Sequence, residues 1–149
     1  MVLNPRVLKK AQEELDRVVG KGQLPDFSDK EGLPYIDAVM KEIIRWSPPL
    51  PIALPRRTMR ADVYRGYFIP AGAIVLQNVW AVCRDPKNYP DPETFNPERF
   101  LKDGKINPLV LNPEDRIFGV GKRYGTPFAP PLIANNYSRT PVGSVLAGT

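Results

Sequence analysis

Eighteen prolines, most of them after Trp46, restrict the fold of this chain more than any other feature of its sequence. Their share is more than twice the usual value of about 5%. Proline fixes the backbone angle φ and has no N–H group, so it interrupts helices and the interior of sheets. The chain after Trp46 is therefore predicted to consist of turns and short extended segments, which argues against a helix bundle.

Two helices are predicted before this proline-rich part. Asn4 and Pro5 are typical of a helix start, an apolar stripe follows them, and Gly20 is expected just beyond the helix end. Charged residues, Glu14 among them, are expected on the solvated face of this helix. The second helix is predicted over residues 33–46, where apolar residues recur with helical spacing and predict a core-facing stripe: Ile36, Val39, Met40, Ile43 and Ile44.

The remaining segments are predicted from their turn residues and alternation. Phe27 is expected to be covered by a short turn that begins at Ser28. Residues 48–55 are expected to run extended, because their prolines exclude both a helix and a central strand. Further along, the pattern predicts a strand pair, a third strand or short buried segment, two turns and a short turn that carries an arginine: residues 64–69 closing at 70–72, then 73–80, 84–86, 89–92 and 95–100.

Charge and composition limit the possible partners. The net charge of +5 and the pI of about 9.4 allow an anionic partner, but no long basic run supports nucleic-acid binding. A single cysteine excludes an internal disulfide, and the absence of histidine argues against a zinc site. No apolar stretch is long enough to span a bilayer, so the chain is expected to be soluble and intracellular.

Glu42 and Arg45 lie one helical turn apart, away from the centre of the predicted apolar stripe. Taken alone, this spacing favours a solvated ion pair worth about 0.3–0.5 kcal/mol. The motifs that follow change this interpretation. In chain order, the motifs are Glu42-Ile43-Ile44-Arg45, residues 64–72 (YRGYFIPAG), residues 80–86 (WAVCRDP), residues 95–100 (FNPERF) and residues 118–123 (FGVGKR).

These five motifs, in this order and with these intervals, resemble the C-terminal part of a cytochrome P-450, a haem-thiolate monooxygenase of the fungal microsomal kind. The resemblance runs from about Asn4 to Arg123. It implies an α+β fold class: a partial cytochrome P-450 fold of two helices, a small mixed sheet and a meander loop over residues 1–123. Residues 124–149 are rich in Pro, Ser, Thr, Asn and Gly and are expected to form an irregular, disordered tail.

The resemblance also implies roles for individual residues. Glu42, Arg45 and Arg99 correspond to the buried triad that supports the haem-binding loop in the family. Arg123 corresponds to an arginine that contacts a haem propionate. Arg56 occupies a position with the same implied role, although a surface arginine in a basic turn is an equal alternative. The family's substrate pocket is implied for four neighbouring residues: Pro51, Ile52, Ala53 and Leu54.

The sequence departs from the family at the iron ligand. The family pattern places the ligand cysteine two residues after the arginine that matches Arg123, and Gly125 stands there. The only cysteine, Cys83, lies in a motif without a metal role and is expected to be a buried, inert thiol. The chain therefore has no predicted metal ligand and no catalytic residue of its own. A shift of reading frame just after Arg123 is one hypothesis for this departure.

Three functional interpretations follow. By resemblance, the chain belongs to an enzyme that oxidises a small hydrophobic substrate with O2, a haem cofactor and electrons from an NADPH-dependent flavoprotein reductase. Alternatively, it is a non-catalytic truncated or pseudogene-like fragment, and the fragment alone is expected to be inactive. The third alternative is a small basic binding module, although no nucleic-acid partner is expected. The resemblance implies the endoplasmic reticulum membrane, whereas this chain, without an anchor, is expected in the cytoplasm.

Overall fold

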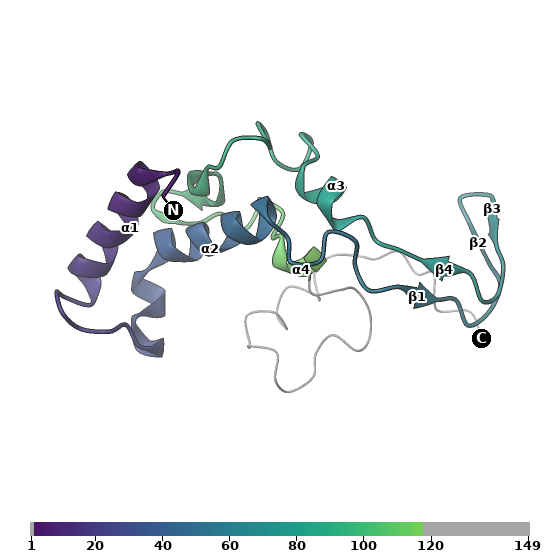
Figure 1. Cartoon of the computed structure of the whole chain (residues 1–149), viewed down its shortest axis with the longest axis horizontal. Helices are drawn as coiled ribbons and strands as arrows, with labels where there is room; N and C mark the ends of the chain where they lie inside the picture. Colours follow the sequence, from purple (N-terminus) through teal and green to yellow (C-terminus); the bar gives the residue numbers. More distant parts are fainter. Residues whose placement is uncertain (1, 118–149) are drawn as a thin grey trace.

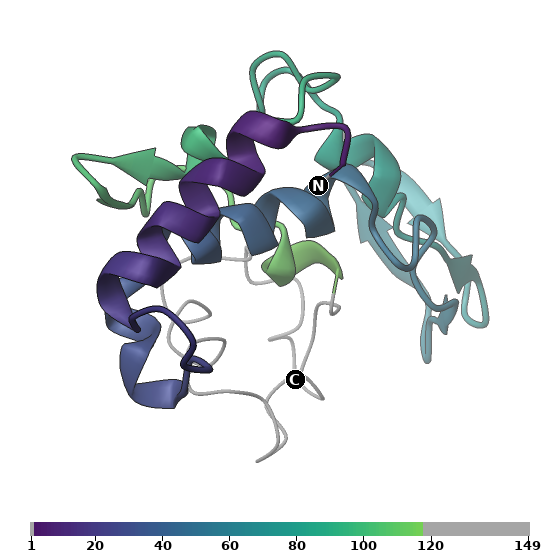
Figure 2. The same cartoon turned by 60° about the vertical axis from the view of Figure 1, so that its left-hand side comes forward.

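The computed structural model describes residues 2–117. Helices α1 (Pro5–Val18) and α2 (Pro34–Trp46) lie side by side at one end of the molecule. The short strands of residues 56–75 form an arm at the other end, called the strand arm below (Figure 1). Figure 2 shows α1 running across α2, with the short helix α4 (Glu114–Ile117) on another side of α2. Among these residues no helix is long and apolar enough to cross a membrane.

Both predicted long helices are present with nearly the predicted bounds. Proline occupies the first turn of each, where its missing N–H group costs nothing. Gly20 follows the end of α1 with a φ of 92°, a conformation that glycine adopts without strain. The 3-10 helix η1 (Phe27–Gly32) connects the two helices and is capped by Asp26. The expectation for Phe27 was wrong, because its side chain is 98% exposed.

Glu14 is buried between α1 and α2. The expectation that it lies on the solvated face of α1 was therefore wrong. Its two carboxylate oxygens accept hydrogen bonds from the backbone N–H groups of Tyr35 and Ile36, at 3.1 and 2.9 Å. These two N–H groups belong to the first turn of α2, where no intrahelical acceptor exists. Because Leu33, the residue before α2, supplies no side-chain cap, Glu14 acts as the cap from a different helix.

We expect Glu14→Ala to lower the free energy of unfolding by about 2 kcal/mol, because it leaves two N–H groups of α2 without an acceptor. Glu13→Ala, on the exposed side of α1, is the matched control and should change stability by less than about 0.5 kcal/mol. Urea unfolding of both variants, followed by circular dichroism, checks this expectation. Equal effects of the two substitutions would contradict the cap.

The face of α2 that is buried differs from the predicted apolar stripe. Met40 and Ile43 are 52% and 40% exposed, so their prediction as core residues was wrong. Val39 is buried as predicted, and the other buried residues of α2 are Ala38, Lys41, Glu42 and Arg45. This face is covered because the 3-10 helix η2 (Pro97–Phe100) and the short strands that follow pack on it. Three of these residues are charged and can be buried because each has an ion-pair partner. Glu42 and Arg45 pair with each other, and Lys41 pairs with Asp37 and Glu114.

The strands form three separate antiparallel pairs rather than one mixed sheet. They are β1 (Arg56–Arg57) with β4 (Ile74–Val75), β2 (Asp62–Tyr64) with β3 (Tyr67–Ile69), and β5 (Leu101–Lys102) with β6 (Lys105–Ile106). The β2–β3 hairpin turns at Arg65-Gly66, both with positive φ, and not at residues 70–72. Two central residues of this conformation match the twist of the flanking strands. The α+β fold class is confirmed.

Residues 48–55 run extended, as the prolines predict. They are joined to residues 77–80 by an isolated bridge between Ile52 and Asn78 and by two flanking backbone hydrogen bonds. The helix α3 (Val79–Cys83) begins directly afterwards, capped by the Asn78 side chain, so only Ile74–Val75 of the predicted strand over residues 73–80 forms. This connection joins the arm of strands to the helical end.

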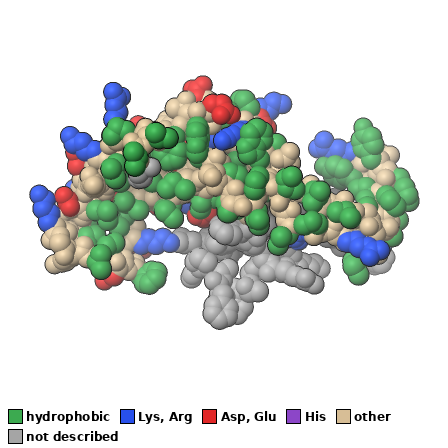
Figure 3. Space-filling model, in the orientation of Figure 1, with side chains coloured by type: hydrophobic (Ala, Val, Ile, Leu, Met, Phe, Trp, Pro, Cys, Tyr) green, Lys and Arg blue, Asp and Glu red, His purple; other side chains and the backbone are tan. Residues whose placement is uncertain are grey.

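Two small apolar clusters form the core. One contains Ala38, Tyr89 and Phe100, and the other contains Val79, Cys83 and Ile117. Many large apolar side chains remain exposed, and Figure 3 shows them over the strand arm as well as over the helical end. The core therefore lies between α2, α3 and the segments that follow α3, and the strand arm contributes little to it.

Candidate functional site

The centre of the site is an ion pair on the buried face of α2. Arg45 donates from Nε to one carboxylate oxygen of Glu42 at 2.7 Å and from Nη2 to the other at 2.8 Å. Both side chains are 0% exposed. The parallel hydrogen bonds match the fork of a guanidinium to the two oxygens of a carboxylate, which fixes both side chains in one orientation.

Arg45 also binds backbone carbonyl groups of segments far away in the sequence. It donates to Cys83 O and Pro92 O, each at 2.9 Å, and to Thr94 O at 3.4 Å. A buried ion pair is stable only where its remaining donors find acceptors, and these carbonyl oxygens supply them. One side chain of α2 therefore holds both the end of α3 and the turn after residue 90.

Arg99 approaches the same carboxylate from η2. Its Nε lies 3.3 Å from the Glu42 carboxylate, and its two Nη atoms donate to the carbonyl oxygens of Pro90, Asp91 and Thr94. Asn96 completes the arrangement with a backbone N–H donated to Glu42 at 2.7 Å. The structure thus brings Glu42, Arg45 and Arg99 together, in a network that fastens residues 83–99 to α2.

Aromatic rings surround the network. The Arg45 guanidinium lies 5.5 Å from the ring centres of both Trp46 and Tyr89. Arg84 lies 5.2 Å from the Trp46 ring and 5.0 Å from the Trp80 ring. These distances suit cation–π attraction, which strengthens where water is excluded. Burial raises the pKa of the Tyr89 hydroxyl above its ordinary value, so this group stays protonated and donates to Leu111 O at 2.9 Å.

Cys83 takes part through its carbonyl oxygen and not through its thiol. The side chain is 1% exposed and packs with Val79 and Ile117. Burial raises the pKa of the thiol, which disfavours the thiolate that acts as a nucleophile or metal ligand. The side chain therefore cannot reach a bound group without unfolding of this cluster.

The other predicted site residues lie apart from the network. Arg56 is exposed in β1, opposite Val75, and has no ion-pair partner among residues 2–117. Within residues 51–54, Ile52 and Leu54 are 60% and 71% exposed. Arg123 and Gly125, together with the predicted tail over residues 124–149, lie outside the described residues.

A thiolate-ligated haem does not fit the residues of this chain. Haem iron takes an axial ligand such as a thiolate or an imidazole, and the chain has one cysteine and no histidine. The cysteine is buried in an apolar cluster. Arg56 and the exposed apolar side chains of residues 51–54 have the chemistry for a propionate and a ring, but they supply no ligand to the iron.

The carbonyl acceptors and the Asn96 N–H group were not predicted from the sequence. Backbone groups are the same at every position, so no residue pattern identifies which of them will accept or donate. The glutamate cap between the helices was missed for a related reason, because Glu14 and Tyr35 are distant in sequence. Prolines at residues 90, 92 and 97 were the available signal, since they predict the turns whose carbonyl groups face Arg99.

Comparison with known proteins supports the family resemblance that was drawn from the order of the five motifs. The family model described as Cytochrome P450 matches residues 1–129. A cytochrome P450 monooxygenase of Armillaria gallica is 52% identical over 124 residues, which are 83% of this chain and 24% of that protein. One from Coprinopsis cinerea is 51% identical over 119 residues, 80% of this chain and 23% of that protein. This chain thus spans about a quarter of the length of these curated relatives.

A solved structure shares the fold as well as the sequence. It is a zebrafish cytochrome P450 with abiraterone, with a TM-score of 0.69 and 39% identity over 80% of this chain and 27% of that one. With the family model matched over most of its length, this chain belongs to the cytochrome P450 family.

Proposed function

We propose that residues 2–117 form a structural support within a haem-dependent monooxygenase, and that the oxidation itself is carried out by a longer protein. The buried network of Glu42, Arg45 and Arg99 carries this proposal. It fixes the path of residues 83–99 against α2 through hydrogen bonds to five backbone carbonyl oxygens: Cys83, Pro90, Asp91, Pro92 and Thr94. In the sequence this segment precedes the motif over residues 118–123, which in the family leads into the haem-binding loop.

The network has the properties of a positioning device rather than of a reaction centre. All three side chains are held by hydrogen bonds to protein groups, and Glu42 and Arg45 have no contact with solvent. No side chain in the network is free to take or donate a proton to a substrate. The contribution of the network to function is therefore to hold the segment that follows residue 99 in a fixed position.

Other residues support the family's activity through their chemistry. Arg56 offers an exposed, always charged guanidinium to a haem propionate, and we propose the same role for Arg123. Pro51, Ile52, Ala53 and Leu54 present an apolar surface that suits a small hydrophobic substrate. Electrons would come from an NADPH-dependent flavoprotein reductase, and the endoplasmic reticulum membrane is the proposed location of the longer protein.

A second candidate is that this polypeptide is a non-catalytic fragment. The observations that favour it are Gly125 at the ligand position and the burial of the only thiol, Cys83. Sequencing the transcript across the codons for residues 123–149 separates the two candidates. If the transcript has a cysteine codon after Arg123, the chain belongs to a complete enzyme. If the transcript has the reading frame that gives Gly125, the chain is a fragment without an iron ligand.

We expect that the 149-residue chain, mixed with haemin, reduced and exposed to CO, lacks the red-shifted Soret band of a thiolate-ligated haem. The reason is that the single thiol is buried and protonated. The measurement is an absorption difference spectrum of the chain and of Cys83→Ser. A thiolate band in the chain that disappears in Cys83→Ser would overturn the assignment of an inert thiol.

A further inference from the structure

The positive charge of the chain is concentrated in the strand arm. Residues 56–75 contain four arginines and one carboxylate, so they carry +3 of the chain's net charge of +5. The arginines are Arg56, Arg57, Arg60 and Arg65. Figure 3 shows basic and apolar side chains, and no acidic one, on the face of the strand arm turned to the viewer. Such a concentration of one sign of charge indicates an anionic partner.

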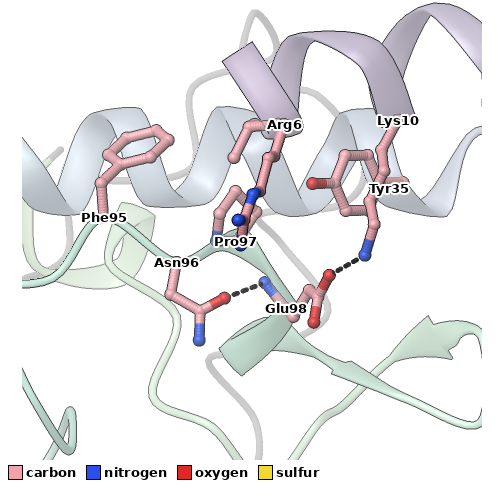
Figure 4. Close-up of a pocket in the computed structure, with 8 residues that line it drawn as sticks. Arg6, Lys10, Tyr35, Phe95, Asn96, Pro97 and Glu98 are labelled. Atoms are coloured by element: carbon pink, nitrogen blue, oxygen red, sulfur yellow. Dashed lines mark hydrogen bonds and ion pairs between the residues drawn. The ribbon is translucent and has the colours of Figure 1, made fainter. Parts of the chain in front are cut away.

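The four arginines of the strand arm lack the carboxylate partners that basic residues of the helical end have. At that end Lys10 of α1, for example, pairs with Glu98 of η2 (Figure 4). None of the four arginines has an ion-pair partner among residues 2–117. The one carboxylate of the strand arm, Asp62, accepts instead from the backbone N–H group of Val63 at 2.7 Å. Four guanidinium groups are therefore available to an anionic partner.

Apolar side chains lie beside these charges. All residues from 56 to 75 are described, and none of them is buried. In the β1–β4 pair each arginine lies opposite an aliphatic residue, Arg56 opposite Val75 and Arg57 opposite Ile74. Directly opposite residues share one face of a strand pair, so each face combines a charge with an apolar side chain. Exposed apolar surface of this extent marks an interaction site, and the partner must offer anionic groups together with an apolar region.

The β2–β3 hairpin carries aromatic rings at its tip. Tyr64 and Tyr67 lie opposite each other beside the turn, and Phe68 lies opposite Val63 in the next pair. Tyr67 and Phe68 are 76% and 69% exposed. Tyrosine has an apolar ring and a polar end, which suits the boundary between hydrocarbon and water in a membrane. Three residues of a strand rise about 10 Å, which is comparable to the depth at which interfacial segments enter a bilayer.

Three of the arginines lie behind this aromatic tip. Arg60 precedes β2 at the open end of the hairpin, and Arg56 and Arg57 lie in the adjoining strand β1. Arg65 lies at the turn itself, where its guanidinium is 5.4 Å from the centre of the Tyr64 ring. The long side chain of arginine can reach back from there to the level of lipid head groups. The order of aromatic tip and basic base therefore matches the order of layers in a membrane surface with anionic lipids.

Two other kinds of anionic partner fit the strand arm less well. A single-stranded nucleic acid could stack its bases on the aromatic rings, but it offers no apolar region to the exposed aliphatic side chains of Met59, Ile74 and Val75. A protein segment could cover these side chains, but it would have to supply a carboxylate for each of four arginines. A lipid surface with anionic head groups meets the charges, the aromatic rings and the aliphatic side chains together.

We propose that the strand arm binds the surface of a membrane that contains anionic lipids. Tyr64, Tyr67 and Phe68 enter the boundary between head groups and hydrocarbon, and Arg56 and Arg60 pair with anionic head groups. This inference goes beyond the proposed function, which places the longer protein at a membrane without assigning a contact surface. Because the contact involves no haem, its failure would leave the supporting role of Glu42, Arg45 and Arg99 untouched.

The test is flotation of the 149-residue chain with two kinds of vesicle, one of phosphatidylcholine alone and one that also contains phosphatidylserine. The chain is expected to bind the anionic vesicles more tightly, and added salt should weaken this binding. Phe68→Ser should weaken it about tenfold, because it removes an exposed ring from the hairpin tip. Phe27→Ser, which removes an exposed ring from η1 at the other end of the molecule, should leave it unchanged.

Two further variants test the charge and the position. Arg60→Ala should weaken binding to the anionic vesicles about fivefold, because each basic residue near such a surface adds attraction. Arg6→Ala removes an exposed arginine from α1 and should have no effect. In Phe68→Trp, brominated lipids should quench more fluorescence than in the unchanged chain, and in Phe27→Trp they should not.

Four results would overturn the proposal. They are no binding to anionic vesicles, equal binding to neutral ones, equal losses in Phe68→Ser and Phe27→Ser, and no added quenching in Phe68→Trp. Tighter binding of a single-stranded oligonucleotide, lost in Phe68→Ser, would also overturn it and assign the strand arm to nucleic acid. Because Phe68, Phe27, Arg60 and Arg6 are exposed, their substitution does not threaten the fold.

Discussion

Glu42→Ala is expected to lower the free energy of unfolding by about 3–5 kcal/mol. The substitution leaves the guanidinium of Arg45 buried at 0% exposure without its carboxylate, and it removes the acceptor of Arg99 and of the Asn96 N–H group. The cost is large because the unpaired charge stays inside the protein. Urea unfolding monitored by circular dichroism gives the difference.

Two variants sharpen this measurement. Glu42→Gln keeps an acceptor oxygen but loses the charge, so we expect a loss between that of alanine and zero. Glu31→Ala removes an exposed glutamate from η1 and should change stability by less than about 0.5 kcal/mol. If Glu42→Ala destabilised the chain no more than Glu31→Ala, the network would have no role in holding residues 83–99.

The same substitution has a second expected effect in a complete enzyme. Under the proposed function, Glu42→Ala there prevents haem incorporation and does not merely slow turnover. The haem content of the purified protein, measured after denaturation, distinguishes these outcomes. A Glu42→Ala enzyme with normal haem content would refute the proposed supporting role.

Phe100→Ala is expected to cost about 3–5 kcal/mol, the range for removal of a buried aromatic ring. Phe100 is 1% exposed, lies edge-to-face with Tyr89 at 6.1 Å, and packs with Ala38 of α2. Its removal creates a cavity between η2 and α2, which weakens the same contact that the charged network holds. The loss is again measured as a shift in the urea unfolding curve.

Phe68→Ala is the matched control for this prediction. Phe68 lies in β3 and is 69% exposed, so the same truncation there should change stability by less than about 0.5 kcal/mol. Similar costs at the two positions would mean that the cluster of Ala38, Tyr89 and Phe100 is not the core of this part of the molecule.

The features that follow from local rules were predictable from the sequence. Proline and glycine positions gave the bounds of α1 and α2, and the prolines after Trp46 excluded a helix from residues 48–55. The proximity of Glu42 and Arg45 also follows from helical spacing. The turn at Arg65-Gly66 carried a recognisable two-residue signal, but Pro70 and Gly72 offered a competing one.

The features that depend on distant partners were not predictable. Which face of α2 is buried depends on where η2 packs, and this contact places Met40 and Ile43 outside although they are apolar. Hydrophobicity alone assigns a buried position to Met40 and an exposed one to Glu42, and both assignments fail. The burial of Glu42 requires Arg99, 57 residues later in the chain.

Helix α2 is anchored near both of its ends by carboxylates. At its first turn Glu14 of α1 holds two backbone N–H groups, and near its last turn Glu42 is held by groups from η2. Two anchors on different sides of a rod prevent it from sliding along its axis and from rotating about it. The exposed ridge of Met40 and Ile43 therefore has a fixed direction. A surface that packs on this ridge would find it already in its final orientation.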